Sequence, residues 1–170
     1  MADLVIRPAI ADDRQVLWDF LAMAAYEPNA AAAKAIPMVA LFLSGWQRPG
    51  DFGFIAEQHD IAIGAVWARQ FPSRAESWFY FDSRTPELSI GVRDHARGHG
   101  LGERLLRALM AEAGRRGLRL CLNVRSTNPA IRLYRRLGFQ IVPDRTVTNR
   151  VGGQSYGMLL DDPPVSSSES

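Results

Sequence analysis

The sequence predicts an α/β fold of the α+β kind, with a mixed, mostly antiparallel sheet of six or seven strands flanked by about four helices. Short runs that alternate apolar and polar residues indicate strands, and apolar residues three and four positions apart indicate helices. A glycine-rich turn over residues 97–102 connects one such strand to one such helix. The 170 residues suit one domain. We expect that domain over residues 1–160 and a disordered tail over 161–170, because DDPPVSSSES has little apolar surface to bury.

The composition excludes several classes of protein. An apolar content of 47% and a charged content of 22% are typical of a soluble globular domain. The net charge of +2 and the scattered arginines, beside Lys34 as the only lysine, argue against a nucleic-acid surface. Cys121 is the only cysteine, so neither a disulfide nor a cysteine metal cluster is expected, and we predict no metal. No membrane span or signal peptide is apparent, which predicts a cytoplasmic protein.

The N-terminal part begins with a predicted strand over residues 4–8, which ends at a proline. Asp12 or Asp13 is suited to cap the helix that follows, where apolar residues recur at helical spacing. A second helical region over residues 30–43 contains Pro37, which should divide it into two pieces.

The middle of the chain contains a predicted hairpin and a long connection. Residues 52–56 and 61–67 read as two strands joined by a short turn at His59 and Asp60. Residues 71–86 are either a strand or a packed loop. Because long loops in compact domains are often functional, this loop is a candidate lid. The aromatic residues in and around these strands either line an acceptor pocket or belong to the core: Trp46, Trp67, Trp78, Phe79, Tyr80 and Phe81.

The C-terminal part alternates strands and helices. We predict a strand over 87–92, a helix over 101–116 capped by Gly117, and a strand over 118–124. Asn128 followed by Pro129 favours a helix start, and that helix should run to Leu137. Two final strands are expected near 139–142 and 155–160.

The turn Arg97-Gly98-His99-Gly100-Leu101-Gly102 is the first feature that carries chemistry. Such a turn directs backbone N–H groups at one place, and the positive end of the helix dipole favours a phosphate or pyrophosphate there. Its spacing is R-x-x-G-x-G, and it lacks the acidic residue of a dinucleotide fold and the Lys-Ser/Thr of a P-loop. Taken alone, it could be a plain glycine turn between a strand and a helix.

A second motif follows about 25 residues later, in the run from Asn128 to Phe139, NPAIRLYRRLGF. Together the two motifs resemble the acetyl-CoA signature and the second cofactor motif of the GNAT superfamily of N-acetyltransferases. Their order, separation and flanking elements fit that family over roughly residues 87–139, and the N-terminal half fits more loosely. The resemblance implies acetyl-CoA as co-substrate. It also implies that the strands around Val92 and Val124 are parallel neighbours that splay to admit the pantetheine.

The cofactor-binding residues implied by the resemblance lie in both motifs. The backbone at Gly98, Gly100, Leu101 and Gly102 would hold the pyrophosphate. Other implied contacts come from a strand end, two turn residues and a helix start: Val92, Arg93, Arg97, His99 and Asn128. The N–H near Val92 would polarise the thioester carbonyl. Three side chains also have plainer interpretations, since Arg97 and His99 could simply be solvated and Asn128 could simply cap its helix.

Tyr134 and Glu87 are the candidate catalytic residues. Tyr134 matches the family position of the general acid that protonates the leaving thiolate, although it could also only pack against the sheet. Glu87 resembles the general base of some members, and its alternative is a solvated residue at a strand edge. Other members keep a glutamate on the next strand, where this chain has Asn123, which cannot act as a base. That departure favours Glu87 or a water relay.

The resemblance therefore implies transfer of an acetyl group from acetyl-CoA to a primary amine of a small molecule or peptide by direct attack. The alternative is a catalytically silent CoA-binding sensor or regulatory module. Because dimers are common in the family, a homodimer is also an option. The sequence does not identify the acceptor, and polyamines, aminoglycosides, amino acids and protein N-termini all remain open.

Overall fold

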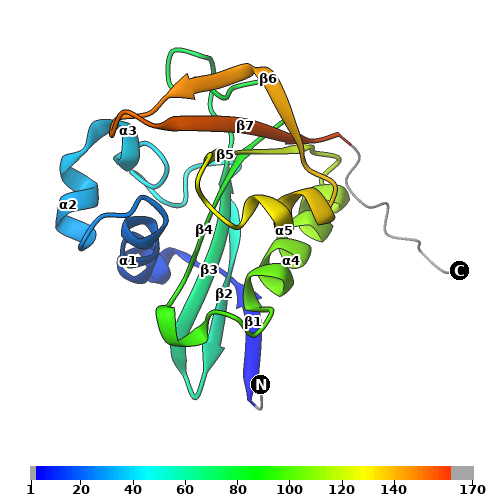
Figure 1. Cartoon of the computed structure of the whole chain (residues 1–170). Coiled ribbons are helices and arrows are strands. Elements are labelled where there is room, and N and C mark those ends of the chain that lie inside the picture. The colour runs from blue at the N-terminus through cyan, green and yellow to red at the C-terminus, as the bar shows by residue number, and fades with distance from the viewer. Residues whose placement is uncertain (1–2, 162–170) are drawn as a thin grey trace, which may run out of the picture. The chain divides into compact units, whose positions relative to one another are not determined.

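A computed structural model describes residues 3–161 and contains one seven-stranded sheet in the order β1-β2-β3-β4-β5-β7-β6 (Figure 1). Four of its ladders, β1–β2, β2–β3, β5–β7 and β6–β7, are antiparallel. Strands β4 (Glu87–Val92) and β5 (Leu120–Arg125) run parallel, with Glu87 opposite Cys121. The predicted mixed sheet with one parallel pair is confirmed. Five α-helices accompany it instead of about four, because Pro37 separates α2 (Ala30–Ala35) from α3 (Pro37–Ala40). The predicted tail falls almost entirely on residues 162–170, outside the described residues.

The chain divides into two compact units. The first contains residues up to Arg69 together with Ser89–Leu109, and the second contains Gln70–Leu88 and the chain from Met110 onward.

In the first unit, β1 (Leu4–Pro8), β2 (Phe52–Gln58) and β3 (Ile61–Arg69) form an antiparallel meander (Figure 1). The predicted hairpin is confirmed, and His59 and Asp60 have φ values of 52° and 62°, as a tight type I′ turn requires.

A hydrophobic core fills the first unit behind this meander. Helix α1 (Arg14–Ala24) contributes Leu17, Phe20 and Leu21, which are buried together with Leu43, Ile55 and Trp67. Lys34, on α2, places its ammonium nitrogen 5.3 Å from the ring centroid of Trp18.

Asp13, one of the two predicted caps, stands at the N-cap position of α1, but its side chain bonds elsewhere. A short 3₁₀ turn, Ala11–Asp13, precedes α1, and Asp13 makes no side-chain capping bond to that helix. Its carboxylate instead accepts two hydrogen bonds from the Arg7 guanidinium, both at 2.8 Å, and one from the Ile10 N–H at 2.7 Å. Arg7 also pairs with Glu57 on β2. A partner from another element therefore outcompetes the local cap.

The second unit contains β5, β7 (Gln154–Leu160) and β6 (Gln140–Thr148), which lie side by side with β7 in the middle (Figure 1). Both final strands begin close to their predicted positions, and β6 runs further than expected. Helix α4 (Leu101–Arg115) ends as predicted, because Gly117 has a φ of 66° and the Leu118 N–H bonds the Ala113 carbonyl at 2.9 Å.

A buried ion pair holds the segment before β2 in the first unit. Arg69 and Asp51, both 1% exposed, form two hydrogen bonds at 2.7 and 3.0 Å. The Arg69 guanidinium also donates to the carbonyls of Leu41 and Ser44. One side chain thus joins the end of β3 to the chain that follows α3.

We expect Arg69→Met to lower the free energy of unfolding by about 3–5 kcal/mol, because it removes the buried cation that pairs with the Asp51 carboxylate and the donor to two carbonyls. Arg107→Ala removes a surface pair with Glu103 and should cost no more than about 1 kcal/mol. Urea unfolding of both variants checks this. Equal losses would show that burial does not distinguish the two pairs.

Candidate active site

The turn between β4 and α4 has the backbone conformation that its glycines predict. Gly98 and Gly100 have φ values of 81° and 77°, which side chains rarely adopt. A Cβ atom built on either glycine would meet nothing within 4 Å. The backbone of the turn is therefore open to close approach by a ligand.

Free N–H groups gather in this turn. In residues 3–161, no protein acceptor is present for the N–H groups of Gly98, His99 and Gly100, whereas the Arg104 N–H bonds the Gly100 carbonyl at 3.2 Å. The N–H groups of Leu101 and Gly102 belong to the first helical turn, where none has an intrahelical partner. This group of donors, at the positive end of a 15-residue helix, is suited to an anion.

Close packing against β3 positions the start of α4. A Cβ atom added to Gly64, on β3, would lie 3.0 Å from the Leu105 side chain and 3.3 Å from the Leu101 side chain. Both leucines are buried. The missing side chain at Gly64 therefore lets the helix approach the strand closely and fixes where the turn begins.

Two of the predicted cofactor-binding residues near the end of β4 are engaged by the protein itself. The Arg93 N–H donates to the Ile63 carbonyl at 2.9 Å, and the Arg93 guanidinium donates to the Ala62 carbonyl and lies 5.1 Å from the Phe20 ring centroid. The Val92 carbonyl accepts a hydrogen bond of 3.3 Å from the Arg97 side chain.

Arg97 and His99 have exposed side chains. A weak 3.5 Å ion pair joins Arg97 to Asp94, which is itself almost fully exposed. Both turn residues therefore face solvent from the first unit, where they could meet a phosphate.

In the second unit, Asn128 and Tyr134 lie before and within α5 (Ile131–Arg136). The Asn128 side-chain oxygen accepts the Ala130 N–H at 2.9 Å, so it caps the turn before the helix, and α5 begins at Ile131, two residues after Pro129, the predicted first helical residue. Tyr134 is 6% exposed, and its ring meets Phe139 edge-on at 6.0 Å between centroids.

Glu87 is buried, which rules out the solvated strand edge considered as its alternative. It is 2% exposed. Its two carboxylate oxygens accept hydrogen bonds from the Ser77 hydroxyl at 2.6 Å and from the Asn123 amide at 2.7 Å. Burial raises the pKa of the Glu87 carboxyl, and the two hydrogen bonds oppose that rise.

Ser77 is a residue of this cluster that the sequence analysis missed. It begins a turn in the 71–86 connection, which is a packed loop and not a strand. The Tyr80 N–H bonds the Ser77 carbonyl at 3.1 Å, and the Phe79 N–H bonds the Ser77 hydroxyl at 3.2 Å. A serine before an aromatic run is a local turn signal, but its carboxylate partner lies ten residues along the chain and is set by the fold.

The four tryptophans have different roles. Trp46 and Trp67 belong to the core of the first unit, where their indole N–H groups donate to the Ile10 and Phe42 carbonyls. Trp18 is also buried, whereas Trp78 is 64% exposed. Only Trp78 is therefore placed to meet an acceptor from solvent.

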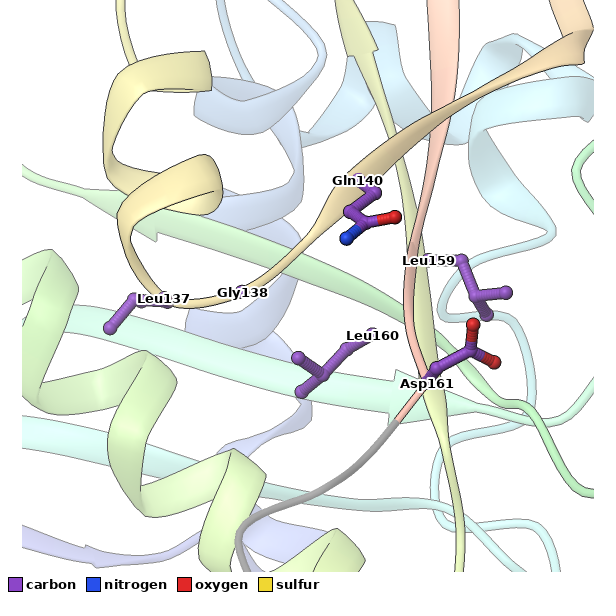
Figure 2. A pocket seen from close by; sticks show the side chains of 6 residues that line it. All are labelled: Leu137, Gly138, Gln140, Leu159, Leu160 and Asp161. Atoms are coloured by element: carbon purple, nitrogen blue, oxygen red, sulfur yellow. The ribbon is translucent and has the colours of Figure 1, made fainter.

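A hollow of about 260 Å³ lies elsewhere in the second unit (Figure 2). Its lining combines the end of α5, the start of β6 and the end of β7: Leu137, Gly138, Gln140, Leu159, Leu160 and Asp161. None of the predicted site residues lines it, and Asp161 pairs with Arg119 at 2.7 Å. This hollow is not where the candidate chemistry gathers.

No group of three or more metal-ligating side chains comes together in residues 3–161. No helix in that range has both the length and the apolar character needed to cross a membrane.

We expect Glu87→Gln to change how stability depends on pH. Because the folded state holds the Glu87 proton to a higher pH than the unfolded chain does, the native protein loses stability as pH rises above about 4.5 and through the raised pKa. The glutamine variant lacks this loss. The free energy of unfolding of the variant minus that of the wild type should therefore increase as the pH rises from 5 to 8. Urea titrations across that range measure this difference. A difference that decreases with pH would contradict a raised pKa of the buried Glu87 carboxyl.

Cys121 should be inert in the folded protein. Burial, with the neighbouring carboxylates of Glu87 and Asp82, raises the pKa of its thiol. We expect an aromatic disulfide reagent to react with it only after urea unfolding, with one thiol released per chain. Fast reaction of the native protein would show that β5 opens readily.

The chain is similar to known acetyltransferases in sequence. The family model for the acetyltransferase (GNAT) family matches residues 16–139. An L-methionine sulfoximine/L-methionine sulfone acetyltransferase of Pseudomonas paraeruginosa is 43% identical over 79 residues, which cover 45% of this chain and 44% of that protein. The match thus spans less than half the length of this curated relative. A 5-NmdU N-acetyltransferase of Pseudomonas phage PaMx11 is 27% identical over 93% of this chain and 99% of its own length.

Solved structures share the fold. A Salmonella typhimurium protein classed as an acetyltransferase, solved with its cofactor acetyl-CoA, has a TM-score of 0.70 and 23% identity, over 95% of this chain and 98% of that one. The ribosomal-protein-S18-alanine N-acetyltransferase of Escherichia coli has a TM-score of 0.66 and 20% identity, over 92% of each chain. With most of its length matched by the family model, this chain belongs to the acetyltransferase (GNAT) family.

Proposed function

We propose that this protein is an N-acetyltransferase that moves an acetyl group from acetyl-CoA to a primary amine. The observation that carries the proposal is the turn with Gly98 and Gly100, which leaves N–H groups free at the start of α4 in a chain of the GNAT family. Coenzyme A carries a pyrophosphate, which is the kind of group that such donors hold. The open space over both glycines fits close approach of that group.

In the proposed reaction the amine attacks the thioester carbonyl, a C–N bond forms, and the C–S bond breaks to release the thiol. Tyr134 would give its phenolic proton to the leaving sulfur. The attacking amine must also lose a proton, either to a water or to Glu87. Burial raises the pKa of the Glu87 carboxyl, which improves it as a base near neutral pH.

The names of relatives suggest which acceptors to try first. By their names, one relative acts on L-methionine sulfoximine and sulfone, another on 5-NmdU, and a structural neighbour on the alanine of a ribosomal protein. A first panel therefore contains L-methionine sulfone, spermidine and a peptide with an N-terminal alanine, with thiol release as the readout.

Acetyl-CoA should stabilise the protein, whereas NAD and ATP should not. At 100 times its dissociation constant a ligand adds about 2.7 kcal/mol. For a domain of this size that corresponds to a rise in melting temperature of roughly 5–10 °C. Differential scanning fluorimetry measures it, and equal shifts with all three ligands would contradict a CoA site.

Gly100→Ala should weaken acetyl-CoA binding, because a Cβ atom strains the turn and covers its N–H groups. Gly152→Ala is the matched control, since Gly152 also has a positive φ, of 87°, and open space around it. Both variants should lose comparable stability, but only the first should lose the thermal shift. Loss in both would mean that strain alone is responsible.

Tyr134→Phe should lower kcat by about 10²–10⁴-fold with little change in acetyl-CoA affinity, because the phenol acts only when the thiolate leaves. Tyr156→Phe, in β7, is the control and should keep its activity. A wild type that binds acetyl-CoA but turns over no amine would instead favour the CoA-binding sensor.

We also propose that the protein is cytoplasmic and forms a homodimer. It is further proposed to bind no metal, nucleic acid or membrane. Cell fractionation tests the location, and light scattering tests the oligomeric state.

A further inference from the structure

A bulge in β6 directs one arginine side chain at the 71–86 loop. Residues 143–145 lie outside the regular register of the β6–β7 ladder, between the pairs that Val142 and Thr146 make. A bulge of this kind bends the strand and re-aims the side chains that it carries. The side chain of Asp144 is 76% exposed, whereas that of Arg145 is only 15% exposed. The bulge therefore turns Arg145 toward the protein.

Arg145 contacts two neighbouring residues of the loop. Its guanidinium Nε donates to the Tyr80 carbonyl at 3.3 Å, and its Cζ atom lies 5.0 Å from the centroid of the Phe81 ring. A planar guanidinium over an aromatic face is an attractive arrangement. Gly157, in β7, allows the contact, because a Cβ atom added to it would lie 2.6 Å from the Arg145 Cβ and 2.9 Å from the Phe79 ring. The bulge and the loop thus meet over Gly157.

The turn at residues 77–80 holds the Ser77 hydroxyl in one orientation. The hydroxyl oxygen accepts the Phe79 N–H at 3.2 Å, which leaves its own proton for the Glu87 oxygen, 2.6 Å away. Each bond in such a chain strengthens the next. The orientation depends on where the turn places the Phe79 N–H, and Arg145 bonds the residue directly after it. A contact on one side of the loop is thereby linked to the buried carboxyl on the other.

Among the described residues, the groups that face Glu87 are uncharged. Ser77 comes from the loop, and Asn123 and the Cys121 thiol come from β5, where Cys121 lies opposite Glu87. The charged groups next in line act on the thiol: Asp82, Arg119 and Arg145. Each of the two hydrogen bonds lowers the pKa of the Glu87 carboxyl against the effect of burial. The placement of Ser77 therefore affects the pH at which Glu87 releases its proton.

We propose that Arg145 is a positioning residue for Glu87: from the β6 bulge it fixes the 77–80 turn, so that the Ser77 hydroxyl donates to the Glu87 carboxyl. The inference rests on the proposed function, in which Glu87 is one of two acceptors for the proton of the amine. It goes beyond that function by adding a residue from a strand that neither sequence motif includes. Arg145 acts through Ser77.

A titration of one carboxyl group tests this role without an acceptor. The Glu87 side-chain carboxyl is followed by ¹³C NMR in glutamate-labelled protein, over the pH range in which the fold persists, and Glu87→Gln identifies its resonance. We expect Glu87 to titrate at a higher pH in Arg145→Ala than in the wild type, because a weakened Ser77 bond stabilises the ionised form less. An unchanged titration would overturn the proposal. If Arg145→Ala does not fold, Phe81→Leu removes the other half of the contact and is judged in the same way.

Asp144→Asn is the matched control in the same bulge, because it removes the exposed ion-pair partner of Arg145 and leaves the guanidinium contact with the loop. Glu87 should titrate in it as in the wild type. A rise as large as that in Arg145→Ala would overturn the assignment to the loop contact.

A double variant identifies the route. Ser77→Ala should by itself raise the pH at which Glu87 titrates, and Arg145→Ala should then add little, because both changes act on the same hydrogen bond. Equal rises with and without Ser77 would overturn the route through its hydroxyl. Arg145→Lys keeps the charge without the planar contact, so a wild-type titration in that variant would show that charge alone is responsible and would also overturn it.

With an acceptor that the panel identifies, the acidic limb of the pH profile of kcat/KM should move to higher pH in Arg145→Ala, as the carboxyl titration does, while the acetyl-CoA KM stays near wild type. A titration that moves without the limb would sink Glu87 as the base but not the positioning role. A wild type without acetyl transfer would sink the proposed function alone. An unmoved titration would sink the positioning role whatever the rates show.

Discussion

The carboxyl group of Glu87 is buried away from water, and side chains from a loop and a neighbouring strand satisfy it. A buried carboxyl group is costly unless hydrogen bonds satisfy it, and the hydroxyl of Ser77 and the amide of Asn123 supply those bonds. Ser77 in turn fixes the 77–80 turn, and the turn brings Phe79 onto the sheet where Gly157 leaves room. One acidic residue therefore organises a strand, a loop and the exposed amide between them.

Local patterns were enough to predict most elements of the fold. The first strand was predicted with the bounds that β1 has, because a proline ends it, and the hairpin turn at His59 and Asp60 follows from polar residues between two apolar runs. Gly117 marks the end of α4 through its left-handed conformation. The turn from Arg97 to Gly102 was likewise visible, because its glycines carry the signal themselves.

Features that depend on partners far apart in sequence could not be predicted. Asp13 looked like a helix cap, but Arg7, held by Glu57 on the neighbouring strand, takes its carboxylate. Glu87 looked like a residue that could be solvated, and only the packing of the 71–86 loop shows it to be buried. Gly157 carried no signal at all, because its role comes from standing opposite Asn123 in a ladder whose register the sequence does not reveal.

The chemistry proposed here has a consequence for the protein's own surface. Of its twenty basic side chains, Lys34 alone ends in an amine, and arginine guanidinium groups do not lose the proton that an acyl acceptor must lose. Among the side chains, Lys34 on α2, beside the Trp18 ring, is thus the one amine that the protein could acylate on itself. Acetylation there would remove the charge and its contact with the indole. Because nearly all of its basic side chains are arginines, the protein offers its own acyl donor almost no side-chain amine to acylate.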